Sequence, residues 1–122
     1  MIDPVTFERI RKRIDNYREA MIQMQIGLTA IPALSPDNGG LGEFEKAQFL
    51  LSNLRSLGFA GIQEFNAPNG RVPSGIRPNI LAKIPGKNHH KTIWILTHLD
   101  IVPPGEMKFW EKDPYQGYVK ND

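Results

Sequence analysis

The stretch that decides the fold is residues 92–104, which read TIWILTHLDIVPP. It starts with an almost continuous run of apolar and β-branched side chains. Such a run is typical of a strand buried on both faces, as in the centre of a sheet covered by helices. Pro103 and Pro104 should end the strand, because proline has no backbone N–H to donate to a neighbouring strand. The stretch therefore predicts a central strand that stops at the two prolines.

Two polar side chains, His98 and Asp100, lie at the carboxyl end of this predicted strand. In open α/β sheets, ligands bind just outside the carboxyl ends of the strands. Residues two apart on an extended backbone point to the same side, so the imidazole and the carboxylate should face together. This pair is the candidate functional site.

The pair permits three interpretations. A neutral imidazole is a good zinc ligand, and a carboxylate on its other ring nitrogen fixes the tautomer and the ring orientation. In the second interpretation His98 is a general base that Asp100 orients. That chemistry calls for an activated serine, and no serine of the chain has the sequence context of a nucleophile elbow. In the third, both side chains simply face water.

A helix of about 20 residues is predicted near the start of the chain. Asp3 can cap it, and Pro4 suits its first turn. Apolar residues then recur at alternating spacings of three and four, at Phe7, Ile10, Ile14, Tyr17, Met21, Met24 and Leu28. They form one face of a helix over residues 5–28, which we expect to pack on a core. The alternative is a dimerising helix, although the repeat is short for a coiled coil.

The middle of the chain predicts a second helix and two strands. Apolar residues at helical spacing run from Leu41 to Leu57, and Gly58 is well placed to cap the end of this helix. Residues 59–65 and 79–84 have the composition of strands, and residues 66–78 should be mostly irregular. The expected fold class is therefore α/β, with two helices followed by strands.

Composition excludes several classes of protein. The 122 residues suit a single domain, and the absence of cysteine excludes disulfides, thiolate zinc sites and a cysteine nucleophile. The net charge of +2 comes without a basic stripe, so nucleic acid is not an expected partner. No apolar stretch approaches the roughly 20 residues of a membrane span, and no signal peptide pattern is present. We expect a cytoplasmic protein without a membrane partner.

The chain resembles the co-catalytic zinc aminoacylase and carboxypeptidase family. This family includes acetylornithine deacetylase, succinyl-diaminopimelate desuccinylase, aminoacylase and the glutamate carboxypeptidases. The resemblance rests on residues 97–106 (THLDIVPPGE), which are followed by Phe109-Trp110 and Asp113-Pro114-Tyr115 and look like the first metal motif of the family. Weaker matches precede it in the family's order, at residues 30–35, 57–59 and 77–82. Together they cover most of residues 20–120.

The resemblance implies a fold and a set of roles. Residues 1–122 would be the N-terminal portion of a three-layer αβα zinc-peptidase-like catalytic domain with a mixed sheet, here incomplete. His98 would be the first zinc ligand, and Asp100 the carboxylate that supports it. A structural role near the site is implied for Trp110, Asp113, Pro114 and Tyr115. The cofactor would be zinc, two ions in the parent protein, with cobalt or manganese as alternatives. By contrast, His89 and His90 match nothing in the motif and are expected to be solvated.

The resemblance also implies what lies beyond these motifs. In the family, a Gly-Arg-Gly-x-x-Asp run with a metal-bridging aspartate follows the Asp-Pro-aromatic motif, and residues 118–122 stand where that run should begin. We therefore expect a fragment that is inactive alone. The parent would cleave N-acyl amino acids or small peptides with a metal-activated water. The alternative is a short binding module that uses the helix over residues 5–28. Self-association is expected either through that helix or through an exposed sheet edge.

Overall fold

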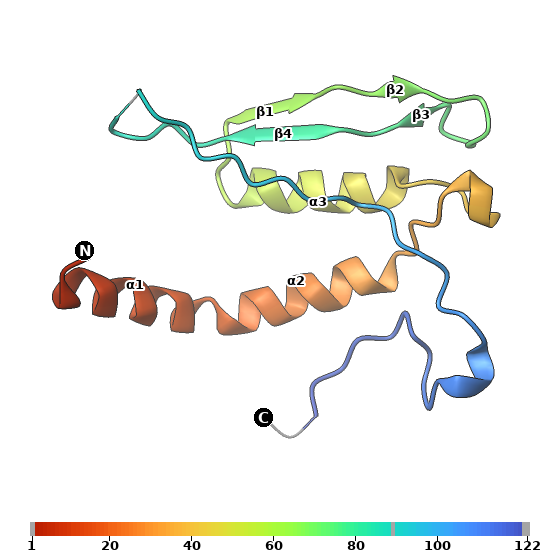
Figure 1. Ribbon diagram of the computed structural model, residues 1–122, viewed down its shortest axis with the longest axis horizontal. Coiled ribbons are helices and arrows are strands. Elements are labelled where there is room, and N and C mark those ends of the chain that lie inside the picture. Colours follow the sequence, from red (N-terminus) through yellow and green to blue (C-terminus); the bar gives the residue numbers. More distant parts are fainter. Residues whose placement is uncertain (1, 89, 121–122) are drawn as a thin grey trace.

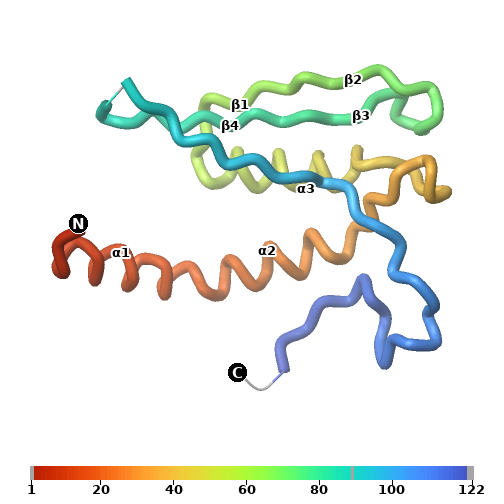
Figure 2. The backbone as a smooth tube through the Cα atoms, viewed as in Figure 1, coloured from red at the N-terminus to blue at the C-terminus, as the bar shows by residue number. Residues whose placement is uncertain are grey.

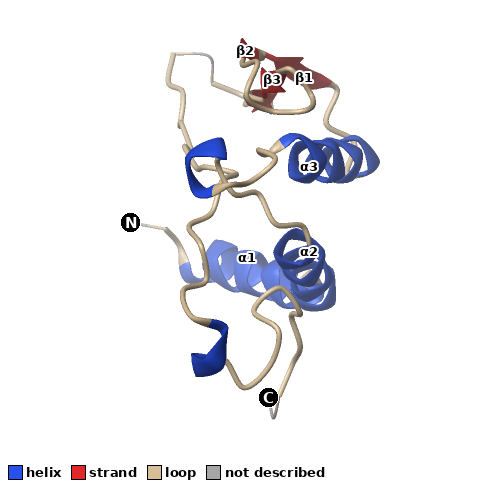
Figure 3. Ribbon diagram, turned by 90° about the vertical axis from the view of Figure 1, so that its right-hand side faces the viewer, coloured by secondary structure: helices blue, strands red, loops and turns tan. Residues whose placement is uncertain are grey.

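The computed structural model describes residues 2–88 and 90–120. Its helices are α1 (Pro4–Asn16), α2 (Arg18–Ala30) and α3 (Phe44–Ser56), with short 3₁₀ helices η1 (Pro36–Asn38) and η2 (Met107–Phe109). Its strands are β1 (Gly61–Glu64), β2 (Ala67–Pro68), β3 (Ile76–Arg77) and β4 (Ile80–Lys83). Figure 1 shows α3 between the strands on one side and α1 and α2 on the other. The same order is seen from the side in Figure 3. No helix of the described residues is long and apolar enough to cross a membrane.

The single helix predicted near the N-terminus is two helices of 13 residues each. Its start is as predicted: Pro4 opens α1, and Asp3 Oδ1 accepts a hydrogen bond from the Thr6 N–H at 3.0 Å. The interruption is at Tyr17, whose N–H donates to Ile14 O, three residues back, at 2.9 Å. This tighter turn breaks the regular pattern of hydrogen bonds between residues four apart. The expectation of one continuous helix is therefore wrong at Tyr17.

The apolar face of α1 does not pack on a core, contrary to prediction. No residue of α1 is buried, and Phe7 and Ile14 are each more than half exposed. Packing begins only in α2, where Gly27 lies against the ring of Phe49 on α3. A methyl group at Gly27 would stand 2.4 Å from Phe49 Cζ. The spacing of apolar residues identified one helix face correctly, but spacing alone cannot supply an element that covers it.

Helix α3 carries half of the buried side chains of the described residues. Ala47 and Leu51 lie in the core with Ala33 and Val72, which come from the loops on either side. The helix begins at Phe44, so Leu41 lies outside it and is exposed, unlike the prediction. It ends as predicted at Gly58, whose φ of 84° is left-handed. The Gly58 N–H donates to Arg55 O, which satisfies a carbonyl of the last turn.

The strands form two antiparallel pairs, β1 with β4 and β2 with β3. Gly61 pairs with Lys83 and Glu64 with Ile80, so both predicted strands are present. The interval between them was predicted to be mostly irregular, but it contains β2 and β3, which pair through Ala67 and Arg77. In Figure 1 the two pairs follow one another as a long hairpin, with α3 beneath β1 and β4.

The decisive stretch, residues 92–97, is not a buried strand. Ile93, Ile95 and Leu96 are 90%, 89% and 95% exposed, and none of the described residues pairs with the segment as a strand. Figure 2 shows it as an extended tube, and the turned view of Figure 3 shows that it lies to one side of α3 and the strands. An apolar run shows which side chains favour burial, but a strand also needs neighbours that accept its hydrogen bonds and cover its faces. The described part is thus an incomplete α/β arrangement with antiparallel pairs.

Candidate functional site

The candidate site follows the extended segment directly. The Ile101 N–H donates to Ala33 O at 3.0 Å, and residues 34 and 101 form a parallel bridge. This contact holds the chain at the loop between α2 and α3. His98 and Asp100 therefore lie immediately before a fixed point of the backbone.

The structure brings His98 and Asp100 together. His98 Nδ1 lies 2.8 Å from the carbonyl oxygen of Asp100 and 3.1 Å from its Oδ1. Both oxygens are acceptors, so Nδ1 must carry the ring proton in the neutral imidazole. The lone pair is then on Nε2, the nitrogen that points away from Asp100. The His98 side chain is 81% exposed and that of Asp100 48%, so Nε2 is open to a ligand.

This donor chemistry fits one metal ligand with its supporting carboxylate. A metal-bound histidine usually donates its other ring N–H to a carboxylate or a carbonyl, and His98 has both. A catalytic zinc ion, however, typically takes three protein ligands. Residues 2–88 and 90–120 contain no group of three or more His, Asp or Glu side chains that could hold an ion. The fit is therefore to one ligand of a site and not to a whole site.

The remaining histidines lie elsewhere. His90 is exposed, and its backbone N–H donates to Asn88 Oδ1 at 2.9 Å in a local turn. His89 lies outside the described residues. Within residues 2–88 and 90–120, no acidic side chain contacts His90 as Asp100 contacts His98.

Two basic side chains, Lys46 and Arg77, have pKa values that the negative charge of Asp100 helps to raise, and sequence reasoning missed both. Lys46 of α3 is only 7% exposed. Burial lowers its pKa, and attraction to Asp100 opposes that shift. Arg77 of β3 has a raised pKa, chiefly because it hydrogen-bonds Glu43 and in smaller part because of Asp100. One signal in the sequence pointed to Lys46: it precedes Leu50 by four residues and so shares a helix face with an apolar side chain.

The Arg77–Glu43 pair fixes the start of α3 to β3. Arg77 Nε donates to Glu43 Oε2 at 2.5 Å, and Arg77 Nη2 donates to Glu43 Oε1. Glu43 is 4% exposed and directly precedes α3. The bidentate geometry joins two elements 34 residues apart in the chain. Both elements that carry the cations of the site are thereby held together.

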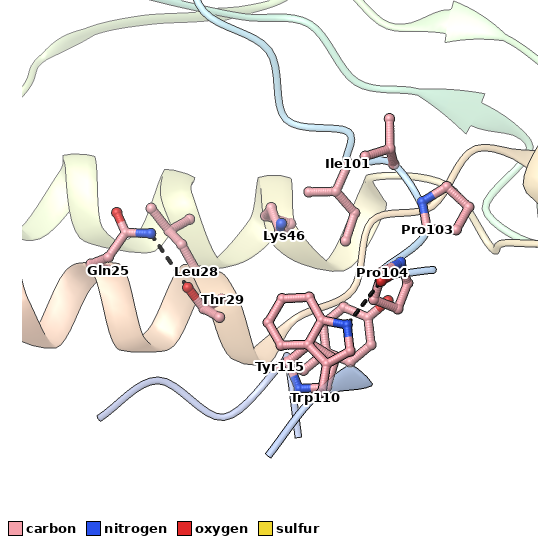
Figure 4. A pocket seen from close by; sticks show the side chains of 11 residues that line it. Gln25, Leu28, Thr29, Lys46, Ile101, Pro103, Pro104, Trp110 and Tyr115 are labelled. Carbon is pink, nitrogen blue, oxygen red and sulfur yellow. Dashed lines mark hydrogen bonds between the residues drawn. The ribbon is translucent and has the colours of Figure 1, made fainter. Parts of the chain in front are cut away.

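A pocket of about 420 Å³ lies beside the candidate site (Figure 4). Its walls come from α2, α3 and the segment after Asp100, and they are Gln25, Leu28, Thr29, Lys46, Ile101, Val102, Pro103, Pro104, Trp110, Pro114 and Tyr115. Trp110 Nε1 donates to Pro104 O at 2.8 Å, which ties the two sides of the segment together. Asp113 Oδ1 accepts from the Tyr115 N–H at 2.9 Å and shapes the turn. The structure therefore places Trp110, Pro114 and Tyr115 in the wall, while Asp113 is outside the lining and holds the turn before Tyr115.

Comparison with known proteins gives relatives but no family model or solved structure that matches. The chain is 34% identical over 108 residues to an uncharacterized metallohydrolase of Methanococcus maripaludis, and 33% identical over 111 residues to one of Methanocaldococcus jannaschii. It is 24% identical over 106 residues to the succinyl-diaminopimelate desuccinylase of Xylella fastidiosa. The matches cover 82%, 84% and 83% of this chain and 25%, 26% and 23% of the relatives. The chain thus spans about a quarter of the length of the curated relatives it matches. These similarities support a metallohydrolase family for this chain.

Proposed function

We propose that this chain contributes the first metal ligand of a hydrolase that cleaves amide bonds in N-acyl amino acids or small peptides. The observation that carries the proposal is the state of His98, whose Nδ1 is engaged by Asp100 and whose Nε2 is open. The names of the relatives support the metal-dependent hydrolase, and the name of the Xylella relative supports an N-acyl substrate. We propose zinc as the metal, with cobalt or manganese as alternatives.

Each residue has a defined task in this proposal. A bound metal would polarise the scissile carbonyl and lower the pKa of a water molecule. His98 offers Nε2 as a ligand, and Asp100 holds the proton on Nδ1 and so fixes the ring. Pro103 and Pro104 stiffen the backbone after the pair. We place the remaining ligands and the general base outside the described residues.

The partners follow from the same proposal. We propose a small-molecule substrate, no nucleic acid and no membrane partner, and a cytoplasmic location. The site is fully accessible from the solvent side, since the His98 side chain is 81% exposed. Such an exposed imidazole can bind a metal ion that other protein groups also bind.

A second candidate function is a non-catalytic interaction module. The exposed apolar residues of α1 favour it: Phe7, Ile10 and Ile14 are 59%, 45% and 53% exposed. In this alternative the helix face binds a partner and His98 has no metal. The two candidates predict different effects of substituting His98: the hydrolase should lose its activity, whereas the interaction module should still bind its partner.

The test is metal-dependent hydrolysis by the complete gene product. We expect chelator-sensitive release of the amino acid from N-acyl substrates, and we expect His98→Ala to abolish it. His90→Ala is the matched control, because His90 is exposed and lacks an acidic partner. Full activity in His98→Ala would contradict the ligand assignment. A product without any metal-dependent hydrolysis would favour the interaction module.

A further inference from the structure

The pocket in Figure 4 has the size and the lining of a site for a small molecule. Its volume is about 420 Å³, and most of its wall is apolar. Trp110 and Tyr115 contribute aromatic rings, and Pro103 and Pro104 contribute rigid ones. The Trp110 indole is held in place, because its Nε1–H donates to Pro104 O at 2.8 Å. Pockets with apolar walls and a few polar groups are typical of sites for small organic molecules.

Three polar side chains interrupt the apolar wall. Two of them contact each other, since Gln25 Nε2 donates to Thr29 Oγ1 at 3.3 Å. The third is Lys46, which is only 7% exposed and whose nitrogen is seen between Leu28 and Ile101 in Figure 4. In the part of the chain that the structure describes, no group forms a hydrogen bond or an ion pair with the Lys46 ammonium group. Of the three, Lys46 is thus the side chain that a ligand could bind.

The ammonium group of Lys46 opens into the pocket. Every side-chain nitrogen or oxygen that is sealed from solvent in the described residues has a hydrogen-bond partner. Since the Lys46 nitrogen has none, solvent must reach it, and it does so where the residue lines the pocket. None of the described residues that line the pocket is acidic. The pocket therefore presents one positive charge and no negative one.

These features specify the chemistry of a ligand. A buried ammonium group without a partner is costly, because it has lost much of its water shell. A negative group in the pocket would remove that cost, and the apolar walls would strengthen the attraction. One ammonium group matches a carboxylate better than a phosphate, which carries more charge and three acceptor oxygens. The remainder of the ligand should be apolar, so that it packs against Trp110 and Tyr115.

We propose that the pocket binds a small organic acid with one carboxylate and an apolar or aromatic body. The Lys46 ammonium group donates hydrogen bonds to the carboxylate, and the body of the acid lies against the rings of Trp110 and Tyr115. Neither His98 nor Asp100 lines the pocket, so binding of the acid needs no metal ion. Acid binding and metal-dependent hydrolysis can therefore be tested separately.

The test is a titration of the metal-free protein with phenylacetate, followed by NMR of the tryptophan indole N–H groups. Trp110 lies in the pocket wall, whereas Trp94 is 72% exposed and does not line the pocket, so Trp94 is the internal control. We expect the Trp110 signal to shift and saturate while the Trp94 signal stays in place. Phenylacetamide has the same ring without the charge, and acetate has the charge without the ring. Each should bind at least about tenfold more weakly than phenylacetate.

Substitution of Lys46 tests the charge directly. Lys46→Met should weaken phenylacetate binding at least about tenfold and should not weaken phenylacetamide binding. Lys46→Arg keeps a cation and should retain the preference for the acid over the amide. Lys83→Met removes an exposed lysine of β4 and should change neither affinity. Circular dichroism checks that the variants fold, and the comparison of the probes on the native protein needs no variant.

Three results would overturn the proposal. They are a Trp110 signal that phenylacetate does not move, equal affinity of the native protein for phenylacetate and phenylacetamide, and unchanged phenylacetate affinity in folded Lys46→Met. His98→Ala should bind phenylacetate as the native protein does, because His98 does not line the pocket. Loss of metal-dependent hydrolysis in that variant therefore leaves acid binding intact, and failure of acid binding leaves the proposed function intact.

Discussion

The imidazole of His98 is held by two oxygens of one residue, the carbonyl and the carboxylate of Asp100. This local geometry follows from their separation by one residue on an extended backbone. The same geometry fixes the tautomer, because two acceptors face Nδ1. The chemistry of the site thus depends on which ring nitrogen of His98 carries the proton. Substitutions that move the proton from Nδ1 to Nε2 should lower the affinity for a metal ion.

Asp100→Asn should weaken metal binding by the complete protein about 10–100-fold, the usual cost of losing a carboxylate behind a histidine ligand. The amide keeps the size of the side chain but removes the negative charge that stabilises the Nδ1 proton. Calorimetric titration with zinc measures the change. Asp15→Asn on α1 is a suitable control, because that carboxylate is exposed and pairs with Arg11 at the far end of the helix pair from the site. Equal affinity in Asp100→Asn and the native protein would remove Asp100 from its supporting role.

Elements are held in place by caps and turns, which the sequence indicates, and by ion pairs between distant residues, such as Arg77 with Glu43, which it does not. Asp3 and Gly58 form hydrogen bonds with residues three positions away in the chain, whereas the hydrogen bonds between Arg77 and Glu43 join residues 34 positions apart. The local devices determine where a helix starts and ends. The long-range pair ties the residue before α3 to β3. These two kinds of contact predict different responses to mutation and to pH.

Acid should fray the first turn of α1. The hydrogen bond from Thr6 lowers the pKa of Asp3 below its ordinary value of 3.8. A carboxyl group with a lowered folded pKa contributes stability above its unfolded pKa and loses it as pH falls through the folded value. We therefore expect amide exchange at Thr6 to increase below about pH 4. An Asp3→Ala chain should show the increase at neutral pH, and unchanged exchange in that variant would contradict the cap.

Two glycine substitutions should differ in cost. Gly58 and Gly42 both have a φ of 84°, so Gly→Ala costs about 1–2 kcal/mol at each for the left-handed backbone. A methyl group at Gly58 meets nothing within 4 Å, whereas one at Gly42 would lie 2.9 Å from Val72 Cγ1. Overpacking of this kind adds about 1–3 kcal/mol. Urea unfolding should find Gly42→Ala the less stable of the two, and the opposite order would contradict the packing described around Val72.

Across the described part of the molecule, two of the stretches with exposed apolar side chains bear on association. Residues 92–97 form an extended segment, and α1 presents an uncovered helix face. Figure 1 shows α1 away from the region where α3 meets the strands, and Figure 3 shows the extended segment to one side of that region. An uncovered extended apolar segment favours pairing with another chain. The described arrangement thus predicts self-association rather than a stable monomer.

Ile95→Lys should reduce concentration-dependent association of this chain if the extended segment is the contact. The added charge on an uncovered strand opposes edge pairing. Analytical ultracentrifugation of the chain at several concentrations measures the effect, with Phe7→Asp as the matched change on α1. If only Phe7→Asp dissociates the chain, the contact lies on the helix. A native chain that stays monomeric at all concentrations would contradict both routes.

The sequence by itself determined the local features of this protein. The start of α1 at Asp3-Pro4, the end of α3 at Gly58, the two strands of four residues and the approach of His98 to Asp100 all follow from hydrogen bonds and backbone preferences within a few residues. Such interactions can be predicted from residues that are close in the sequence, because these residues alone set the geometry of the interaction.

Only the tertiary structure decided the contacts between distant residues. The exposure of residues 92–97, the burial of Lys46 and the pairing of Arg77 with Glu43 depend on which elements meet. An apolar run carries a tendency to be buried, but burial needs a covering element, and no property of the run specifies one. A lysine on a helix is likewise ordinary until its position places it in a core. The charges around the site therefore come from the folding of α3 and β3, while the His98–Asp100 pair comes from the chain itself.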